Sequence, residues 1–215
     1  MKRLNTYITE KFRVSRDMAF KDELTPNDTE ELINIINSRV ESLKTDKTNK
    51  KKCLDLTDIN IDKIKNLGWL FVNCPHVKII DIRGWDTRDV TNMEYMFFNC
   101  ENLVEIKMDD TFNTDECITM ERMFANCGNL KTIYVSNWRV DNAQNMANMF
   151  YACKKINNLD LSRWHIQGVN NMYKMFAFCL KLDNIKLFKK PAPNTTIKNM
   201  FKNCPTEIIP DWYKT

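Results

Sequence analysis

The sequence of 215 residues is poor in several features that catalytic proteins use. It contains four glycines, too few for a glycine-rich phosphate-binding loop. Its two histidines, His76 and His165, lie far apart in unrelated local contexts, and neither is accompanied by a nucleophile that it could activate. The formal net charge of +4 is too small to indicate nucleic acid or a membrane surface as a partner. We therefore predict a protein that is not an enzyme and binds no cofactor.

Long hydrophobic runs are also missing. No stretch approaches the 18 or more apolar residues that a transmembrane helix requires. The N-terminus begins Met-Lys-Arg-Leu-Asn-Thr, and no apolar segment follows the positive charges, as it would in a secretory signal. We therefore expect a cytoplasmic protein that does not interact with membranes. In that compartment the eight cysteines remain reduced.

Six of the cysteines define an internal repeat. They occur at positions 74, 100, 127, 153, 179 and 204, with spacings of 25 to 27 residues, and a Met-Phe or Leu-Phe pair precedes each of them. Zinc sites require closely spaced pairs such as Cys-x-x-Cys, and the sequence has none. The repeat predicts that these cysteines form a buried column, one in each unit, and that there is no metal site.

Each unit has the same order of hydrophobic patterns. Residues 93–100 have apolar side chains at positions i, i+3, i+4 and i+7, which predicts a helix of about two turns. Residues 103–108 then alternate with a period of two, which predicts a short strand. A large aromatic residue follows at the corner of four units, namely Trp85, Phe112, Trp138 and Trp164. The unit is therefore expected to be a strand, a corner and a short helix.

Units of this kind bury their apolar faces only by stacking. The sequence thus predicts an α/β fold, a leucine-rich-repeat-like solenoid of short parallel strands and short helices with about six coils. We expect the solenoid and its C-terminal cap to occupy residues 53–215. A capping helix near 26–44, started by Thr25 and Pro26, and a Lys-rich linker should occupy 24–52. Residues 1–23 are expected to be a leader or docking segment.

The motif Met-x-x-Met-Phe-x-x-Cys-x-x-Leu-x-x-Ile, with Trp-Asp-Thr-x-x-Val-Thr-Asn-Met at 85–93, resembles the BspA-like leucine-rich repeat proteins. The resemblance covers residues 53–212 and implies a curved solenoid that binds a protein partner. The first residues, 4–17, resemble short leaders of bacteriophage proteins, which implies a phage source and association with a virion.

In such solenoids the outward side chains of the strands form the concave face, where ligands usually bind. The residues predicted to lie on this face are Asp81, Arg83, Glu105, Lys107, Asp109, Thr132, Tyr134, Ser136, Asn158, Asp160, Lys186 and Phe188. Their mixed charge favours a protein partner. One alternative is a structural component of a phage particle or other multi-protein assembly. Another is nucleic-acid binding through Lys44, Lys47 and Lys50–Lys52, which the lack of interleaved aromatic residues makes a weaker interpretation.

Overall fold

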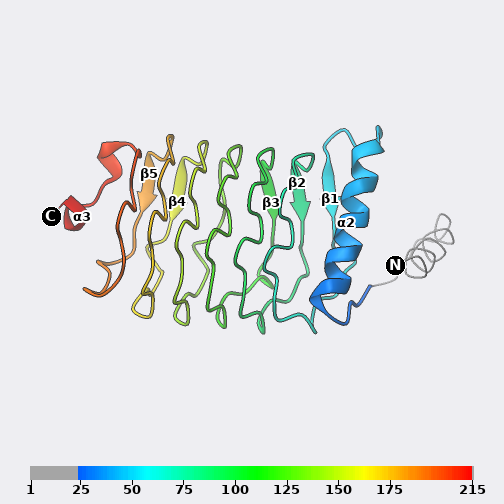
Figure 1. Cartoon of the computed structure of the whole chain (residues 1–215), viewed down its shortest axis with the longest axis horizontal. Helices are drawn as coiled ribbons and strands as arrows, with labels where there is room; N and C mark the ends of the chain where they lie inside the picture. Colours follow the sequence, from blue (N-terminus) through cyan, green and yellow to red (C-terminus); the bar gives the residue numbers. More distant parts are fainter. Residues whose placement is uncertain (1–23, 215) are drawn as a thin grey trace.

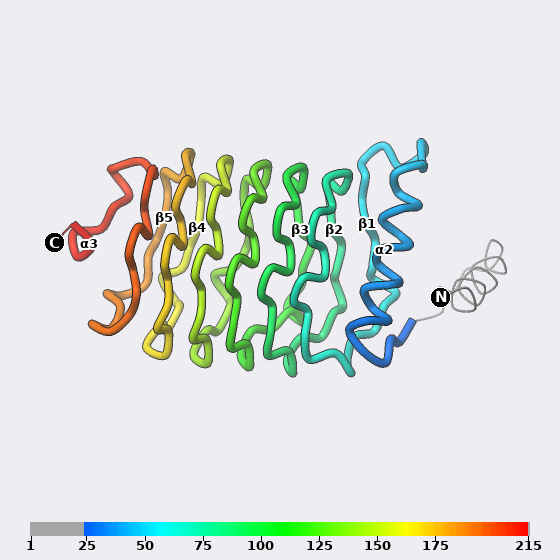
Figure 2. Tube along the Cα trace, viewed as in Figure 1, coloured from blue at the N-terminus to red at the C-terminus, as the bar shows by residue number. Residues whose placement is uncertain are grey.

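The fold is a row of chain passes that lie side by side, with a helix at each end (Figure 1). The computed structural model describes residues 24–214, so the predicted leader segment 1–23 lies outside the described residues. Figure 2 shows that the passes follow one another in sequence order, from the N-terminal end to the C-terminal end. We number them by their strands: passes 1 to 3 contain β1, β2 and β3, pass 4 contains Thr132, and passes 5 and 6 contain β4 and β5.

The strands are short and parallel, as the period-two pattern predicts. β1 (Cys53–Asp55), β2 (Ile79–Asp81) and β3 (Glu105–Lys107) form one sheet, and β4 (Asn158–Asp160) and β5 (Asn184–Lys186) form a second. The register pairs Ile80 with Ile106 and Leu159 with Ile185, so equivalent residues of neighbouring repeats lie side by side. Short strands, few helices and a sequence repeat together make an α/β repeat fold.

The predicted short helix in each unit is wrong. Residues 93–100 instead form two consecutive turns, in which the N–H of Met96 donates to the carbonyl of Met93 and that of Cys100 to that of Phe97. The third residues of these turns, Tyr95 and Asn99, have φ of 56° and 62°, as in type II turns. Two such turns bury the same i, i+3, i+4 and i+7 positions as a helix does. The hydrophobic pattern therefore does not distinguish the two structures.

The turns of neighbouring passes are joined into a continuous ladder. We call this the turn ladder, and it comprises the eight-residue segments that begin at Leu67, Met93, Met120, Met146, Met172 and Ile197. The N–H of Phe97 donates to the carbonyl of Met123 at 2.8 Å, and that of Phe124 to the carbonyl of Met149 at 2.9 Å. In an α-helix these N–H groups would bond within the segment, whereas here they hold successive passes together.

The core consists of columns of identical residue types. The phenylalanine column stacks with ring centroids 5.1 to 5.8 Å apart, and it comprises Phe71, Phe97, Phe124, Phe150, Phe176 and Phe201. Five of the repeat cysteines donate Sγ–H to a phenylalanine carbonyl of the preceding pass at 2.9 to 3.1 Å. Burial of each phenylalanine side chain stabilises the fold by about 1.5–3 kcal/mol. The columns therefore hold neighbouring passes together.

Helices cover both ends of the row. α2 (Thr29–Thr45) buries Leu32, Ile36, Val40 and Leu43, and it begins at the N-cap Asp28 rather than at the predicted Thr25. The Asp28 side chain accepts a hydrogen bond from the N–H of Glu31, which fixes this start.

The C-terminal end, where the sequence predicts a cap, is helical. It forms a short 3-10 helix, η1 (Thr206–Ile208), and then α3 (Asp211–Lys214). The ring of Tyr213 lies edge-on against Phe201, the last member of the phenylalanine column. Within residues 24–214, no helix has the length and hydrophobicity that a membrane crossing requires.

Candidate functional site

The outward side chains of the strands form a row across the passes. We call the surface around this row the strand face. The register places Asp81 beside Lys107 and Asp160 beside Lys186, and Tyr134 occupies the same repeat position in pass 4. Side chains that the sequence separates by 26 or 27 residues are therefore neighbours in space. The row runs as two ion pairs with a tyrosine between them.

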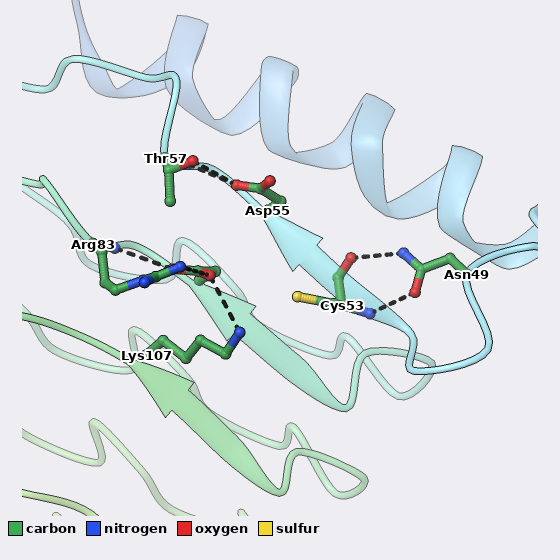
Figure 3. A network of polar contacts seen from close by, with 7 residues as sticks. Asn49, Cys53, Asp55, Thr57, Arg83 and Lys107 are labelled. Carbon is green, nitrogen blue, oxygen red and sulfur yellow. Dashed lines mark hydrogen bonds and ion pairs between the residues drawn. The ribbon is translucent and has the colours of Figure 1, made fainter.

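The acidic and basic residues of the row neutralise one another. Lys107 Nζ lies 3.4 Å from Asp81 Oδ2, and Lys186 Nζ lies 3.3 Å from Asp160 Oδ2. Arg83 also donates to both carboxylate oxygens of Asp81 at 2.8 Å, and Figure 3 shows Arg83 and Lys107 converging on this carboxylate. The hydrogen bond from Arg83 lowers the pKa of Asp81, although partial desolvation opposes the shift. Asp81 is thus ionised, almost buried and held in place.

Tyr134 differs from its neighbours because it is 88% exposed. The other exposed large hydrophobic side chains have exposed fractions between 41% and 53%. An aromatic side chain loses much water-exposed surface when a partner covers it, which is why tyrosine is enriched at interfaces. Of the side chains on this face, Tyr134 would therefore lose the most water-exposed apolar surface when a partner binds.

The sheet is interrupted beside Tyr134. Within the described residues no bridge pairs β3 with pass 4, whereas Thr132 pairs with Asn158 of β4. The repeat at this junction is 27 residues long, because one residue is inserted between Lys107 and Phe112. The turn ladder tolerates the insertion, since Thr119 still bridges Asn92 and Asn145. The strand side opens instead.

Two hollows flank Tyr134, and the first lies at the interruption. The first, which we call the junction hollow, has a volume of about 270 Å³, and residues that line it include Met108, Asp109, Asp110, Asp115, Trp138 and Arg139. The second has a volume of about 220 Å³, and residues that line it include Thr132, Ser136, Asn158, Asp160 and Lys186. Tyr134 borders both. The surface is thus a protruding ring between two depressions.

The remaining predicted residues are distributed unevenly. Glu105, Arg83 and Asp109 are exposed beside the row, and the Asp109 carboxylate accepts a hydrogen bond from the N–H of Gly84. Phe188 is only 3% exposed and belongs to the hydrophobic core, so its predicted place on the outward face is wrong. Burial of its apolar ring outweighs the strand alternation, which ends with β5 at Lys186.

Part of the junction hollow lies outside the residues predicted from the sequence. Asp110, Asp115, Trp138 and Arg139 were not predicted as site residues, because they lie at the corners rather than on the strands. The single 27-residue spacing indicates an irregular repeat near these residues, but it does not say whether the turns or the strands are disrupted.

The Lys-rich segment is partly engaged in local contacts. Lys44 pairs with Glu41 at 2.5 Å. Lys52 Nζ donates to the carbonyls of Leu43 and Asp46 at 2.7 and 2.9 Å. These contacts connect the linker to the end of α2, and nucleic-acid binding by the segment stays a prediction.

The cysteines are arranged as structural residues. Burial raises the pKa of Cys127 to about 12, so its thiol is protonated and uncharged at neutral pH. Within residues 24–214, no three His, Cys, Asp or Glu side chains are grouped so that they could hold a metal ion. The column instead bonds to backbone carbonyls, as described above.

A protein-family model matches most of the chain. The chain belongs to the family described as "Mycoplasma protein of unknown function, DUF285", whose model matches residues 39–107 and 98–212. This match fits the predicted resemblance to the BspA-like leucine-rich repeat proteins. No curated protein matches the chain.

One solved structure is similar, a leucine-rich cell surface protein from Faecalibacterium prausnitzii, with 19% identity and a TM-score of 0.45. The similarity covers 66% of this chain and 35% of that protein, so the chain spans about a third of its length.

Proposed function

We propose that the chain is a non-enzymatic protein-binding module, a leucine-rich-repeat-like solenoid of about six coils that binds its partner through the strand face. The observation that carries this proposal is Tyr134, which is 88% exposed between two internally paired Asp–Lys couples and borders both hollows. A single large aromatic side chain on a rigid, self-neutralised surface is typical of the centre of a protein interface.

The charges of the face favour a protein over a nucleic acid. A phosphate backbone attracts an unbroken basic stripe, because binding releases counterions from successive phosphates. Here Lys107 and Lys186 are each bound to a carboxylate, so neither presents a free positive charge. A protein surface of mixed polarity can accommodate both members of each pair.

The rigid surroundings of Tyr134 also support binding. On the C-terminal side of Tyr134, Thr132 bridges Asn158 of β4, and β4 pairs with β5 over the buried Leu159. A partner that covers Tyr134 therefore meets paired strands on this side, which lowers the entropic cost of association. Tyrosine residues in such positions commonly account for about 2 kcal/mol of binding free energy or more.

Affinity capture tests the proposal. The wild-type chain and a Tyr134→Ala, Lys107→Glu double variant are used as baits in lysate of the native source, with and without nuclease treatment, and the bound proteins are identified by mass spectrometry. We expect one stoichiometric partner for the wild type and at least about 30-fold less for the double variant, which corresponds to about 2 kcal/mol.

A second variant, with Lys44, Lys47 and Lys50–Lys52 changed to serine, is the control and should retain the partner. Equal capture by wild type and double variant, at equal circular dichroism, would contradict the role of the strand face. Loss of the partner after nuclease treatment or in the lysine variant would favour nucleic-acid binding. Recovery of virion components by both baits would favour the structural alternative.

A further inference from the structure

Two of the three corner tryptophans of the repeat make the same kind of hydrogen bond, and the third does not. The indole N–H of Trp85 donates to the carbonyl of Leu56 at 3.1 Å, and that of Trp164 to the carbonyl of Val135 at 2.9 Å. In both cases the acceptor belongs to the preceding pass and lies just after its strand position, at Leu56 after β1 and at Val135 after Thr132. No residue of the described chain accepts a hydrogen bond from the indole N–H of Trp138. Trp138 nevertheless is only 5% exposed, and it lines the junction hollow.

The interrupted sheet explains the missing acceptor. The Trp138 ring is parallel to that of Trp164, with 5° between the planes and 6.4 Å between the centroids, so both occupy the corner in the same way. The equivalent acceptor for Trp138 would come from the end of β3 near Met108, where the inserted residue separates pass 3 from pass 4. The N–H therefore borders the hollow rather than a carbonyl. Because no side-chain nitrogen or oxygen of the described residues is both buried and unpaired, the indole nitrogen is accessible from the hollow.

The charges around the hollow are mainly negative. Three carboxylates and one guanidinium line it, those of Asp109, Asp110, Asp115 and Arg139. Arg139 lies 3.3 Å from Asp115, which leaves Asp109 and Asp110 without a basic partner in the hollow. Partial desolvation raises the pKa of Asp109, but hydrogen bonds from Thr111 and Gly84 outweigh it and lower the pKa below its ordinary value. Asp109 is thus ionised at neutral pH.

These groups define what the hollow can accept. The indole N–H can donate to a hydrogen-bond acceptor such as a peptide carbonyl, and the carboxylates of Asp109 and Asp110, which have no ion-pair partner in the hollow, attract a cation. The exposed ring of Tyr134, at the edge of the hollow, can contact that cation through its face. A volume of about 270 Å³ is below that of most small-molecule sites and suits one side chain of a longer ligand.

We propose that the junction hollow binds an extended peptide segment of the partner that carries a lysine or arginine. A backbone carbonyl of the segment accepts the hydrogen bond from Trp138, and its basic side chain lies between Asp109 and Asp110 beside Tyr134. The inserted residue thereby changes a structural corner into a recognition site. This inference rests on the proposed function of the strand face, because it names the part of the partner that the face recognises.

Nuclear magnetic resonance with blocked tripeptides tests the inference without the partner. The probe is Ac-Gly-Arg-Gly-NH2, titrated into the 15N-labelled full chain, and the indole N–H signals are assigned through Trp138→Phe and Trp164→Phe variants. We expect a saturable downfield shift of the Trp138 indole proton, because it acquires a carbonyl acceptor. The Trp164 indole signal should not move. The control peptide Ac-Gly-Gln-Gly-NH2 should bind about fivefold more weakly, since it lacks the positive charge.

Two matched variants test whether the charge of the hollow, rather than a general change in the protein, determines the preference for arginine. Asp110→Asn should remove most of the preference for arginine over glutamine, while Asp62→Asn, an exposed carboxylate in pass 1, should leave it unchanged. An unmoved Trp138 signal at millimolar peptide, or equal affinities of the two peptides for the wild-type chain, would overturn the inference.

The outcomes also distinguish the two proposals. If capture depends on Tyr134 but the tripeptides leave Trp138 unmoved, the peptide site is wrong and the proposed function stands. If the tripeptides bind and capture does not depend on Tyr134, the protein-binding role of the strand face is wrong and the peptide pocket stands.

Discussion

The two sides of the array respond differently to the same inserted residue. On the turn side, the ladder crosses the junction of passes 3 and 4 without a break, and the N–H of Phe97 donates to the carbonyl of Met123 as in every other repeat. On the strand side, the sheet divides into two, and a hollow opens next to Trp138. The extra residue in the corner therefore interrupts the strand pairing and leaves the turn ladder continuous.

This difference indicates that the turn side contributes more to stability than the strand side does. The turn ladder is continuous and lies over the stacked phenylalanine column, so it holds the passes together. The strand face has shorter segments and an interruption, and it leaves Tyr134 exposed, where we propose that a partner binds. Stability and recognition can then change independently, which the following variants test in order of decreasing effect.

The largest effect is expected from a charge in the core beneath the turn ladder. Met149 is completely buried, so Met149→Asp places an unpaired carboxylate among apolar side chains and should cost about 4 kcal/mol or more. Thermal unfolding followed by circular dichroism measures the loss. Lys154→Asp, at an exposed position of the same pass, is the control and should change stability by less than about 0.5 kcal/mol. Unchanged melting of Met149→Asp would contradict the buried columns.

A smaller effect is expected on the strand side at Asp81. Asp81→Asn leaves the charges of Arg83 and Lys107 without their carboxylate and should cost about 2 kcal/mol at pH 7. The pKa of Asp81 is lower in the folded chain than in the unfolded one, so its stabilisation is complete above the unfolded pKa near 4 and is lost as the pH falls through the folded pKa.

Urea unfolding of the wild type and the Asn variant at pH 7 and pH 3 tests the sign. The difference in unfolding free energy should shrink as the pH is lowered. A difference that grows towards low pH would contradict the ion-paired state.

Deletion of Asp110 is expected to remove the difference between the two sides. It restores the 26-residue spacing, so β3 should pair with pass 4 and a carbonyl should reach the Trp138 indole. We expect a gain of about 1 kcal/mol, the value of one hydrogen bond, and a downfield shift of the Trp138 indole proton. A loss of stability with an unmoved indole signal would show that the insertion is not what keeps the sheet open.

The smallest effect is expected at a left-handed residue of the turn ladder. Ala152 has φ of 55°, a conformation that glycine adopts without the clash of a Cβ atom, so Ala152→Gly should stabilise the chain by about 0.5–1 kcal/mol. Ala147, a buried alanine that lacks positive φ, is the matched control, and Ala147→Gly should destabilise by a similar amount. Equal effects of the two substitutions would contradict the left-handed turns.

Most of the buried columns could be predicted from the sequence, because stacking requires an apolar side chain at the same position of every unit. The buried positions of Met93, Phe97 and Cys100 and the row through Lys107 and Tyr134 follow from the period alone. The helical conformation of 93–100 was predicted incorrectly, since two turns and a helix bury the same positions. The better indication is Asn99, because asparagine adopts positive φ more readily than most residues.

The junction hollow could not be predicted, because it depends on whether the inserted residue interrupts the turn ladder or the strand pairing. The inserted residue between Lys107 and Phe112 is visible in the sequence. Whether it disrupts the turns or the strands depends on the hydrogen bonds and packing of both sides. The buried position of Phe188 likewise depends on how the chain turns after β5.

The central claim is that the partner contacts the strand side and not the turn side. Each side offers one exposed aromatic residue for a matched test: Tyr134, 88% exposed, and Trp69, 51% exposed and stacked on Tyr95. The measurement is photo-crosslinking in native lysate, with p-benzoylphenylalanine at position 134 or at position 69. We predict one discrete crosslinked protein from position 134 and none from position 69. A crosslinked protein from position 69 with none from position 134 would contradict the account.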